Sequence, residues 1–175
     1  KPIGQTVEEP TGRPGTTILY DEFGIAHITG KTREDLAFGA GWVTARDRNL
    51  LFELGRGPAR AAVADVPGID AFSLVVSGQT FIPSPAAEQL VTDQVNLIVA
   101  TYGDEGRQIV SDAQAYADGL NAYFAASGRA PLVPPANVND VVAVTAFIGS
   151  IFGAGGGGEA TNAEFLATLV ADMGE

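Results

Sequence analysis

The stretch GAGWVTARDRNLL, residues Gly39–Leu51, places an Arg-Asp-Arg triplet inside an apolar run. Apolar residues recur at three- and four-residue steps from about Thr32 to Arg56, which predicts one long amphipathic helix. Asp47 falls on this apolar stripe, so we expect its carboxylate to face the interior. A buried carboxylate is costly unless it is paired, and we therefore expect an arginine or a cluster of backbone N–H groups beside it. Asp47 would then belong to a structural ion pair or act as a catalytic acid or base.

Two short β-rich runs precede this helix. TTILY and IAHI flank the turn DEFG, in which Gly24 is free to take a positive φ, and this pattern predicts a β-hairpin. An isolated hairpin is marginally stable, so we expect it to join a larger sheet. His27, the single histidine, lies in the second run, where a structural hydrogen-bonding role is expected. Residues 1–15 are expected to form an extended arm and residues 16–175 one domain.

Helices are predicted to fill the rest of the chain, at about residues 88–102, 106–127, 140–152 and 162–175. Gly128 is expected to end the second of them, and Asn137 or Asn139 to cap the third. The third helix is apolar almost all round, so we expect it to be buried on several sides. The predicted fold class is α+β, a mostly helical chain with a short β-hairpin.

Composition excludes several classes of protein. The 175 residues suffice for one domain, but only 18% are charged while 46% are apolar, which suggests that something else covers part of the surface. A net charge of −11 argues against a nucleic-acid partner. The absence of cysteine excludes disulfides and thiolate metal sites. No apolar run approaches the roughly 20 residues of a membrane span.

A self-contained active site is not evident. Ser150 lies in an apolar helix rather than in a G-x-S-x-G turn, and no S-x-x-K, H-E-x-x-H or EF-hand pattern occurs. A G-x-G-x-x-G pattern spans Gly153–Gly158, but it follows a helix, whereas a dinucleotide fingerprint follows a strand. We interpret these glycines as a loop that passes close to another surface and delivers Glu159.

Several motifs occur in an order that resembles the amino-terminal part of the penicillin acylase family. Asp21–Ile28 resembles the family's D-x-x-G-V-P-H-I turn, with Ala26 in place of proline. Phe38–Arg48 resembles its DLAFG-GYV-A-DR helix, with Trp42 in place of tyrosine. Ala115–Ser127 resembles its YADGVNA helix, and FIGSIFGAGGGGEATN resembles the apolar helix, loop and E-x-x-N that follow. The likeness reaches from the hairpin to the carboxyl end.

The resemblance implies an N-terminal nucleophile hydrolase that acts on amides. In this family a precursor cuts itself into a small α chain and a larger β chain, which together form an αββα fold. The nucleophile, usually serine, is the first residue of β, its own α-amine is the base, and β carries the oxyanion hole. The present chain would be the α subunit and would contain no catalytic residue. Family members are exported, which implies a periplasmic or extracellular location.

The resemblance also implies roles for single residues. Ile151 falls where family members place an apolar pocket residue, and Phe152 and Phe147 lie near it, so these three are expected to bind the acyl group; an ordinary core role is the alternative. The glycine loop implies a roomier pocket than one for penicillin G, which favours fatty acyl amides. Glu159 matches a glutamate that ligates a structural calcium shared with β; a helix-capping role is the alternative.

Two rival interpretations remain from the residues alone. One is a non-catalytic helical protein that binds a hydrophobic small molecule between its helices. The other is an interaction subunit without any part in a substrate site.

Overall fold

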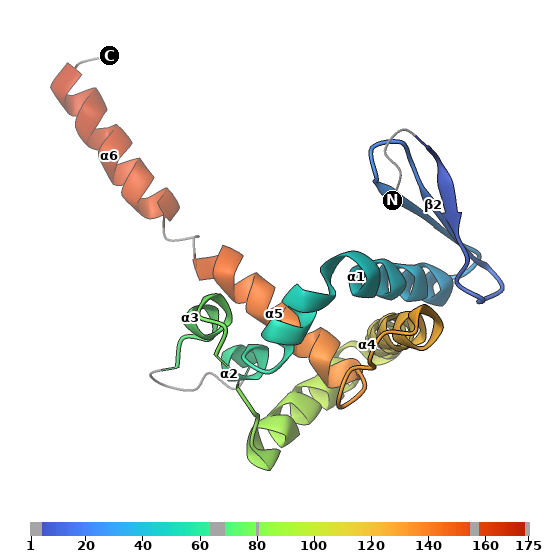
Figure 1. Ribbon diagram of the computed structural model, residues 1–175. Helices are drawn as coiled ribbons and strands as arrows, with labels where there is room; N and C mark the ends of the chain where they lie inside the picture. Colours follow the sequence, from blue (N-terminus) through green and yellow to red (C-terminus); the bar gives the residue numbers. More distant parts are fainter. Residues whose placement is uncertain (1–4, 64–68, 80, 155–157, 174–175) are drawn as a thin grey trace.

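A computed structural model describes residues 5–63, 69–79, 81–154 and 158–173, without the side chains of residues 152–162, 169, 172 and 173. The described chain is mostly helical with a small antiparallel sheet, which confirms the α+β class (Figure 1). No helix in these ranges is long and apolar enough to cross a membrane. The elements are β1 (Val7–Glu9), β2 (Thr16–Tyr20), β3 (Ala26–Gly30), α1 (Arg33–Arg56), α2 (Ala59–Val63), α3 (Ala71–Val76), α4 (Pro85–Ser127), α5 (Val138–Ala154) and α6 (Gly158–Met173).

The sheet has the order β1-β2-β3, and both pairs of strands are antiparallel. The predicted hairpin is β2–β3, in register with Ile18 opposite Ile28, and Gly24 takes φ 82° in its turn. β1 comes from residues that were expected to be an extended arm. Its Glu9 accepts a hydrogen bond from the Trp42 indole at 3.2 Å, which ties this edge strand to α1.

The turn of the hairpin is organised by Asp21. One oxygen of its carboxylate accepts the backbone N–H groups of Phe23 and Ile25, at 3.0 and 2.8 Å. The other lies 2.9 Å from Nε2 of His27. The hydrogen bond to His27 is the main reason why the pKa of Asp21 is lowered. The histidine therefore has the structural role that its position on a strand predicts.

Helix α1 begins where the sequence predicts. Thr32 and Asp35 form a capping box, in which each side chain accepts from the other residue's backbone N–H. The buried face of the helix, however, is not the whole of the predicted apolar stripe. Phe38 and Trp42 are buried, whereas Leu36 and Leu50 are exposed.

The prediction that Asp47 faces the interior is wrong. Asp47 is exposed, and its carboxylate accepts a hydrogen bond from the Tyr20 hydroxyl at 2.9 Å. Burial and this hydrogen bond raise the pKa of Tyr20. Arg46 points inward instead, with its guanidinium 4.0 Å from the Tyr20 ring centre and 2.9 Å from the Glu9 carboxylate. Leu36 and Leu50 face outward, whereas Val43 of the same stripe packs against the core.

Helices α1 and α4 cross at two glycines. A Cβ at Gly41 would lie 2.0 Å from the Tyr116 carbonyl oxygen, and a Cβ at Gly119 would lie 2.0 Å from the Phe38 carbonyl oxygen. Only residues without a side chain allow backbones to approach so closely. The core next to this crossing joins both helices to the sheet and contains Ile18, Tyr20, Phe38, Trp42, Ala45, Phe52, Ala117, Leu120, Tyr123, Phe124, Leu132 and Ala136.

Helix α4 contains both helices that the sequence predicts between residues 88 and 127. They meet at Gly103, whose φ of 56° and ψ of −119° interrupt the helical backbone. Gly128 ends the second of them in the left-handed conformation, with φ 69°, as its position predicts. Asn137 caps α5, because its side-chain oxygen accepts the backbone N–H of Asp140 at 3.1 Å.

The carboxyl-terminal half of α5 is less covered than its composition predicts. Ala143 and Phe147 are buried, but Ala146, Ile148 and Ile151 are exposed. Helix α6 extends away from the other helices in Figure 1, and its exposed residues include Phe165, Leu166 and Val170. None of the described elements covers these apolar surfaces.

Candidate functional site

The residues predicted to bind an acyl group lie on α5. Phe147 is 8% exposed and packs in a second core cluster with Ala59, Ala61, Ala71, Val91 and Ala143. Ile151, one turn further along the helix, is 38% exposed. Phe152 also belongs to α5 and Glu159 to α6, but the side chains of both lie outside the described part of the structure. Their predicted contacts with substrate and calcium therefore stay predictions.

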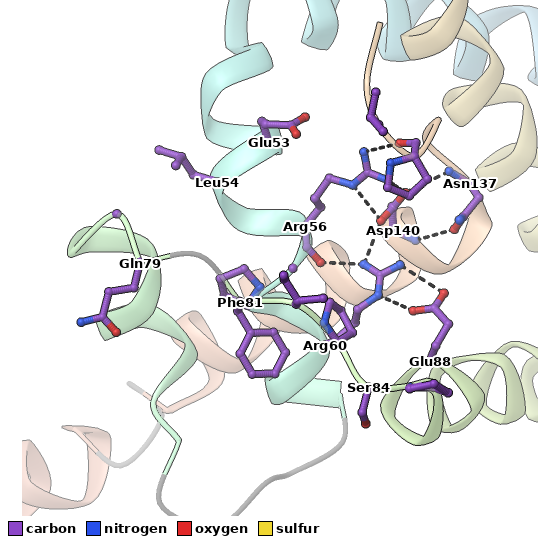
Figure 2. Close-up of a pocket in the computed structure, with 18 residues that line it drawn as sticks. Glu53, Leu54, Arg56, Arg60, Gln79, Phe81, Ser84, Glu88, Asn137 and Asp140 are labelled. Carbon is purple, nitrogen blue, oxygen red and sulfur yellow. Dashed lines mark hydrogen bonds and ion pairs between the residues drawn. The ribbon is translucent and has the colours of Figure 1, made fainter.

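The structure instead brings together a buried cluster of charges that the sequence does not reveal (Figure 2). Asp140, in the first turn of α5, is fully buried. Its Oδ1 accepts from Arg56 Nε at 3.1 Å and from Arg60 Nη1 at 2.8 Å. Its Oδ2 accepts from Arg56 Nη2 at 2.9 Å and from the backbone N–H of Asn137 at 3.0 Å. We call Arg56, Arg60, Glu88 and Asp140 the ion-pair cluster.

Glu88 forms the outer side of the ion-pair cluster. It lies in the first turn of α4 and accepts two hydrogen bonds from Arg60, at 2.5 and 3.2 Å, and one from Asn139 at 2.8 Å. The hydrogen bond from Arg60 is the main reason why the pKa of Glu88 is lowered. Burial alone would lower the pKa of Arg60, but its carboxylate neighbours raise it instead. Both shifts favour the charged forms of Glu88 and Arg60 near neutral pH.

The backbone completes the hydrogen bonding of the two arginines. Arg60 Nη1 donates to the carbonyl of Arg56 at 2.6 Å, and Arg56 Nη1 donates to the carbonyl of Pro134 at 2.8 Å. A buried ion pair offsets its desolvation only when such further hydrogen bonds are present. The groups of the ion-pair cluster are hydrogen-bonded to one another and to neighbouring residues of the chain, so their arrangement suits holding helices together rather than proton transfer.

Two cavities adjoin α5, and neither is lined by Phe147 or Ile151. The first, of about 750 Å³, lies against the ion-pair cluster, and its other wall includes Phe81, Ile82 and Val133. The second, of about 460 Å³, lies among α1, α4 and α5 and has an almost wholly apolar lining. That lining consists of Ala37, Ile98, Ile109, Asp112, Ala113, Tyr116, Val141, Val142, Thr145 and Ala146.

The described residues contain no group of three or more His, Asp or Glu side chains that could hold a metal ion. Calcium requires six to eight oxygen ligands. One glutamate such as Glu159 would therefore need partners from outside the described residues.

The ion-pair cluster carries little sequence signal. Arg56 and Arg60 are separated in sequence by one helical turn, which is a common spacing in helices. Their shared partner Asp140 lies 84 and 80 positions away in the sequence. An acidic residue in the first turn of a helix is also favourable without any partner, through the helix dipole. Only the tertiary structure distinguishes Asp140 from such a residue.

Comparison with known proteins agrees with the order of the sequence motifs. The family model described as Penicillin amidase matches residues 15–172. Penicillin G acylase from Escherichia coli is 29% identical over 107 residues, which cover 61% of this chain and 11% of that protein. The chain thus corresponds to a small part of the length of that relative. Because the family model matches nearly all of its residues, the chain belongs to the penicillin amidase family.

Proposed function

We propose that this chain is the α subunit of a heterodimeric amidohydrolase, whose larger β chain arises from the same precursor by autocatalytic cleavage. Membership of the penicillin amidase family supports this proposal. The observation that carries it is the exposed apolar surface on the second half of α5. Ala146, Ile148 and Ile151 are open to solvent in a helix with almost no polar residues there. A larger polypeptide that closes over this surface would bury it.

Burial of this surface by a second polypeptide is energetically favourable. Burial of apolar surface stabilises a complex by about 25 cal/mol for each Å² removed from water. Large exposed apolar side chains also occur on α6 and at the end of α1, including Phe165 and Leu51. Large exposed apolar side chains in such numbers are typical of protein–protein interfaces. We infer that the β chain contacts α5 and α6 together.

The proposed reaction is acyl transfer. The N-terminal serine of β attacks the carbonyl carbon of an amide, the amine leaves, and water then hydrolyses the acyl-enzyme ester to release the acid. The present chain would bind the acyl group through Ile151 and Phe152, with Phe147 behind them. Each methylene that enters such a pocket contributes about 0.8 kcal/mol of binding. The glycines after α5 favour a fatty acyl group over phenylacetyl.

Two further parts of the proposal concern metal and location. Glu159 would supply one carboxylate to a structural calcium ion, and the β chain would supply the remaining ligands. The enzyme would act in the periplasm or outside the cell.

Native mass spectrometry of the purified full-length gene product, followed by an acyl-amide panel, tests the proposal. We expect a complex of this chain with a larger chain that begins with serine. We also expect hydrolysis of fatty acyl p-nitroanilides in preference to phenylacetyl p-nitroanilide. A folded monomer without amidase activity would refute the assignment.

A second candidate function rests on the apolar cavity of about 460 Å³ among α1, α4 and α5. Its volume lies within the range of small-molecule sites. A non-catalytic protein that binds a hydrophobic molecule there would remain a monomer and would bind a fatty acid without turnover. The same experiment, with fatty-acid binding measured by calorimetry, separates the two functions.

A further inference from the structure

We propose that the ion-pair cluster positions α5, so that Asp140 is a positioning residue for acyl-chain selectivity. The inference rests on the proposed function, in which the end of α5 that carries Ile151 lines the acyl pocket.

The first step of the argument is that the start of α5 is held on every side. Both oxygens of the Asp140 carboxylate accept two hydrogen bonds, and a carboxylate has about four acceptor sites. The donors have fixed geometry, because Arg56 approaches with two nitrogens at 3.1 and 2.9 Å. Any shift of the helix start therefore breaks at least one buried, charge-assisted hydrogen bond.

The second step is that four helix ends meet at this point. Arg56 is the last residue of α1, Arg60 lies on α2, Glu88 lies in the first turn of α4, and Asp140 lies in the first turn of α5. Figure 2 shows the side chains of the four residues of the ion-pair cluster facing one another between these elements. Asn139 adds a second link from α5 to α4, since it donates to Glu88 and to Thr92, the latter at 2.9 Å.

The third step concerns the free end of α5. Beyond Ala143, the buried side chain is Phe147, and the residues from 148 to 151 are exposed. The direction of the helix thus depends on the contacts at its start, on Val144, which packs against both core clusters, and on Phe147. Ile151 lies eleven residues beyond Asp140, which is about 16 Å along a helix. A tilt of about 10° at the start would move Ile151 by about 3 Å at this rise per residue.

Asp140 acts through the helix and not on the substrate. It is 0% exposed, and its acceptor sites are filled by this chain's own donors, so it cannot contact a reacting amide. A group that only stabilised the fold would change the amount of active enzyme equally for every substrate. A group that sets the position of Ile151 changes the ratio between long and short acyl chains.

The test uses the full-length protein, processed to both chains, with hexanoyl and decanoyl p-nitroanilides as substrates. Asp140→Asn keeps the shape of the side chain but removes its charge. Glu88→Gln is the milder variant, because Glu88 is half-buried at the edge of the cluster. Asp35→Asn is the matched control: Asp35 is a buried acid that pairs with Arg13 at 2.9 Å and caps the start of α1, the opposite end of that helix from Arg56.

We expect Asp140→Asn to shift the decanoyl-to-hexanoyl ratio of kcat/KM by about tenfold, which is the low end of discrimination by a misfitted apolar pocket. The change should appear mainly in KM, because the acyl tail is bound in both the ground state and the transition state. Glu88→Gln should shift the ratio by about threefold, since it loosens Arg60 without exposing Asp140. Asp35→Asn should lower the melting temperature and leave the ratio at the wild-type value.

Unchanged ratios in both cluster variants, with an active wild-type enzyme, overturn the positioning role and leave the proposed function standing. If Asp140→Asn does not fold, Glu88→Gln alone decides. A shifted ratio in that variant then supports the positioning role, and an unchanged ratio overturns it. A shift of equal size in Asp35→Asn also overturns the inference, because general destabilisation would then explain it. A wild-type complex that hydrolyses no acyl amide overturns the proposed function, and this inference with it.

Discussion

Replacing Gly119 by alanine would place a methyl group where α1 and α4 touch through their backbones. The new Cβ would lie 2.0 Å from the carbonyl oxygen of Phe38, 2.9 Å from its carbon and 3.0 Å from the backbone nitrogen of Trp42. Carbon and oxygen in a close contact normally lie about 3.3 Å apart. The two helices would therefore have to separate by about 1 Å, because helical backbone cannot rotate away as a flexible side chain does.

The expected loss of stability in Gly119→Ala is the difference between two opposing effects. Overpacking of a well-packed core costs about 1–3 kcal/mol, and a clash with backbone belongs at the upper end of that range. Alanine gains about 1 kcal/mol over glycine in helix propensity. The net loss is about 2 kcal/mol, which would lower the melting temperature of a domain of 175 residues by about 4–8 °C and that of a larger full-length protein by less.

Thermal unfolding of the purified full-length protein, followed by circular dichroism, measures this effect. Gly55→Ala is the control on α1, because no heavy atom lies within 4 Å of the position of its Cβ. We expect that variant to melt at or above the wild-type temperature. Gly41→Ala should resemble Gly119→Ala, and the double variant should lose less than the sum, since one separation of the helices relieves both clashes.

Equal melting temperatures for Gly119→Ala and Gly55→Ala would refute the reasoning. Strict additivity of Gly41→Ala and Gly119→Ala would show that the two glycines do not share one helix crossing.

Three other perturbations have defined outcomes. Trp42→Phe removes the indole N–H that donates a hydrogen bond to Glu9, and it should lower the free energy of unfolding measured in urea by about 1 kcal/mol. An unchanged urea midpoint would show that this hydrogen bond does not stabilise the protein. Gly128→Ala forces a side chain into φ 69° and should cost about 1 kcal/mol by the same assay; no loss would argue against the left-handed cap. Arg60 lowers the pKa of Glu88, so the unfolded state binds more protons once the pH falls below the ordinary value of 4.5. The melting temperature should therefore fall with pH through that window, and less so in Glu88→Gln.

Local signals in the sequence locate most of the elements. Thr32 with Asp35 starts α1, Gly128 ends α4, and Asn137 caps α5, because each of these effects depends on residues within a few positions of one another. Gly24 similarly marks the turn between β2 and β3. The ordered motifs also identify the family without any coordinates.

The buried face of α1 could not be predicted from such local signals. Leucine periodicity assigns Asp47 to the interior of α1, but the structure buries Phe38 and Trp42 there and leaves Asp47 exposed. The face is chosen by Gly41 and Gly119, which allow α4 to approach α1 closely. A hydrophobicity pattern gives glycine no weight, so it cannot detect such a crossing.

What the sequence by itself determines is where several helices and turns begin or end, such as the start of α1 at Thr32 and the end of α4 at Gly128, and to which family the chain belongs. The tertiary structure alone decides that β1 joins the sheet, that Asp140 is fully buried whereas Asp47 is exposed, and that Ile151 stays exposed on α5. The physical reason is the range of the interactions. Caps and turns depend on neighbouring residues, whereas Asp140 is stabilised by arginines that lie 80 or more positions away and meet it only when four helix ends converge.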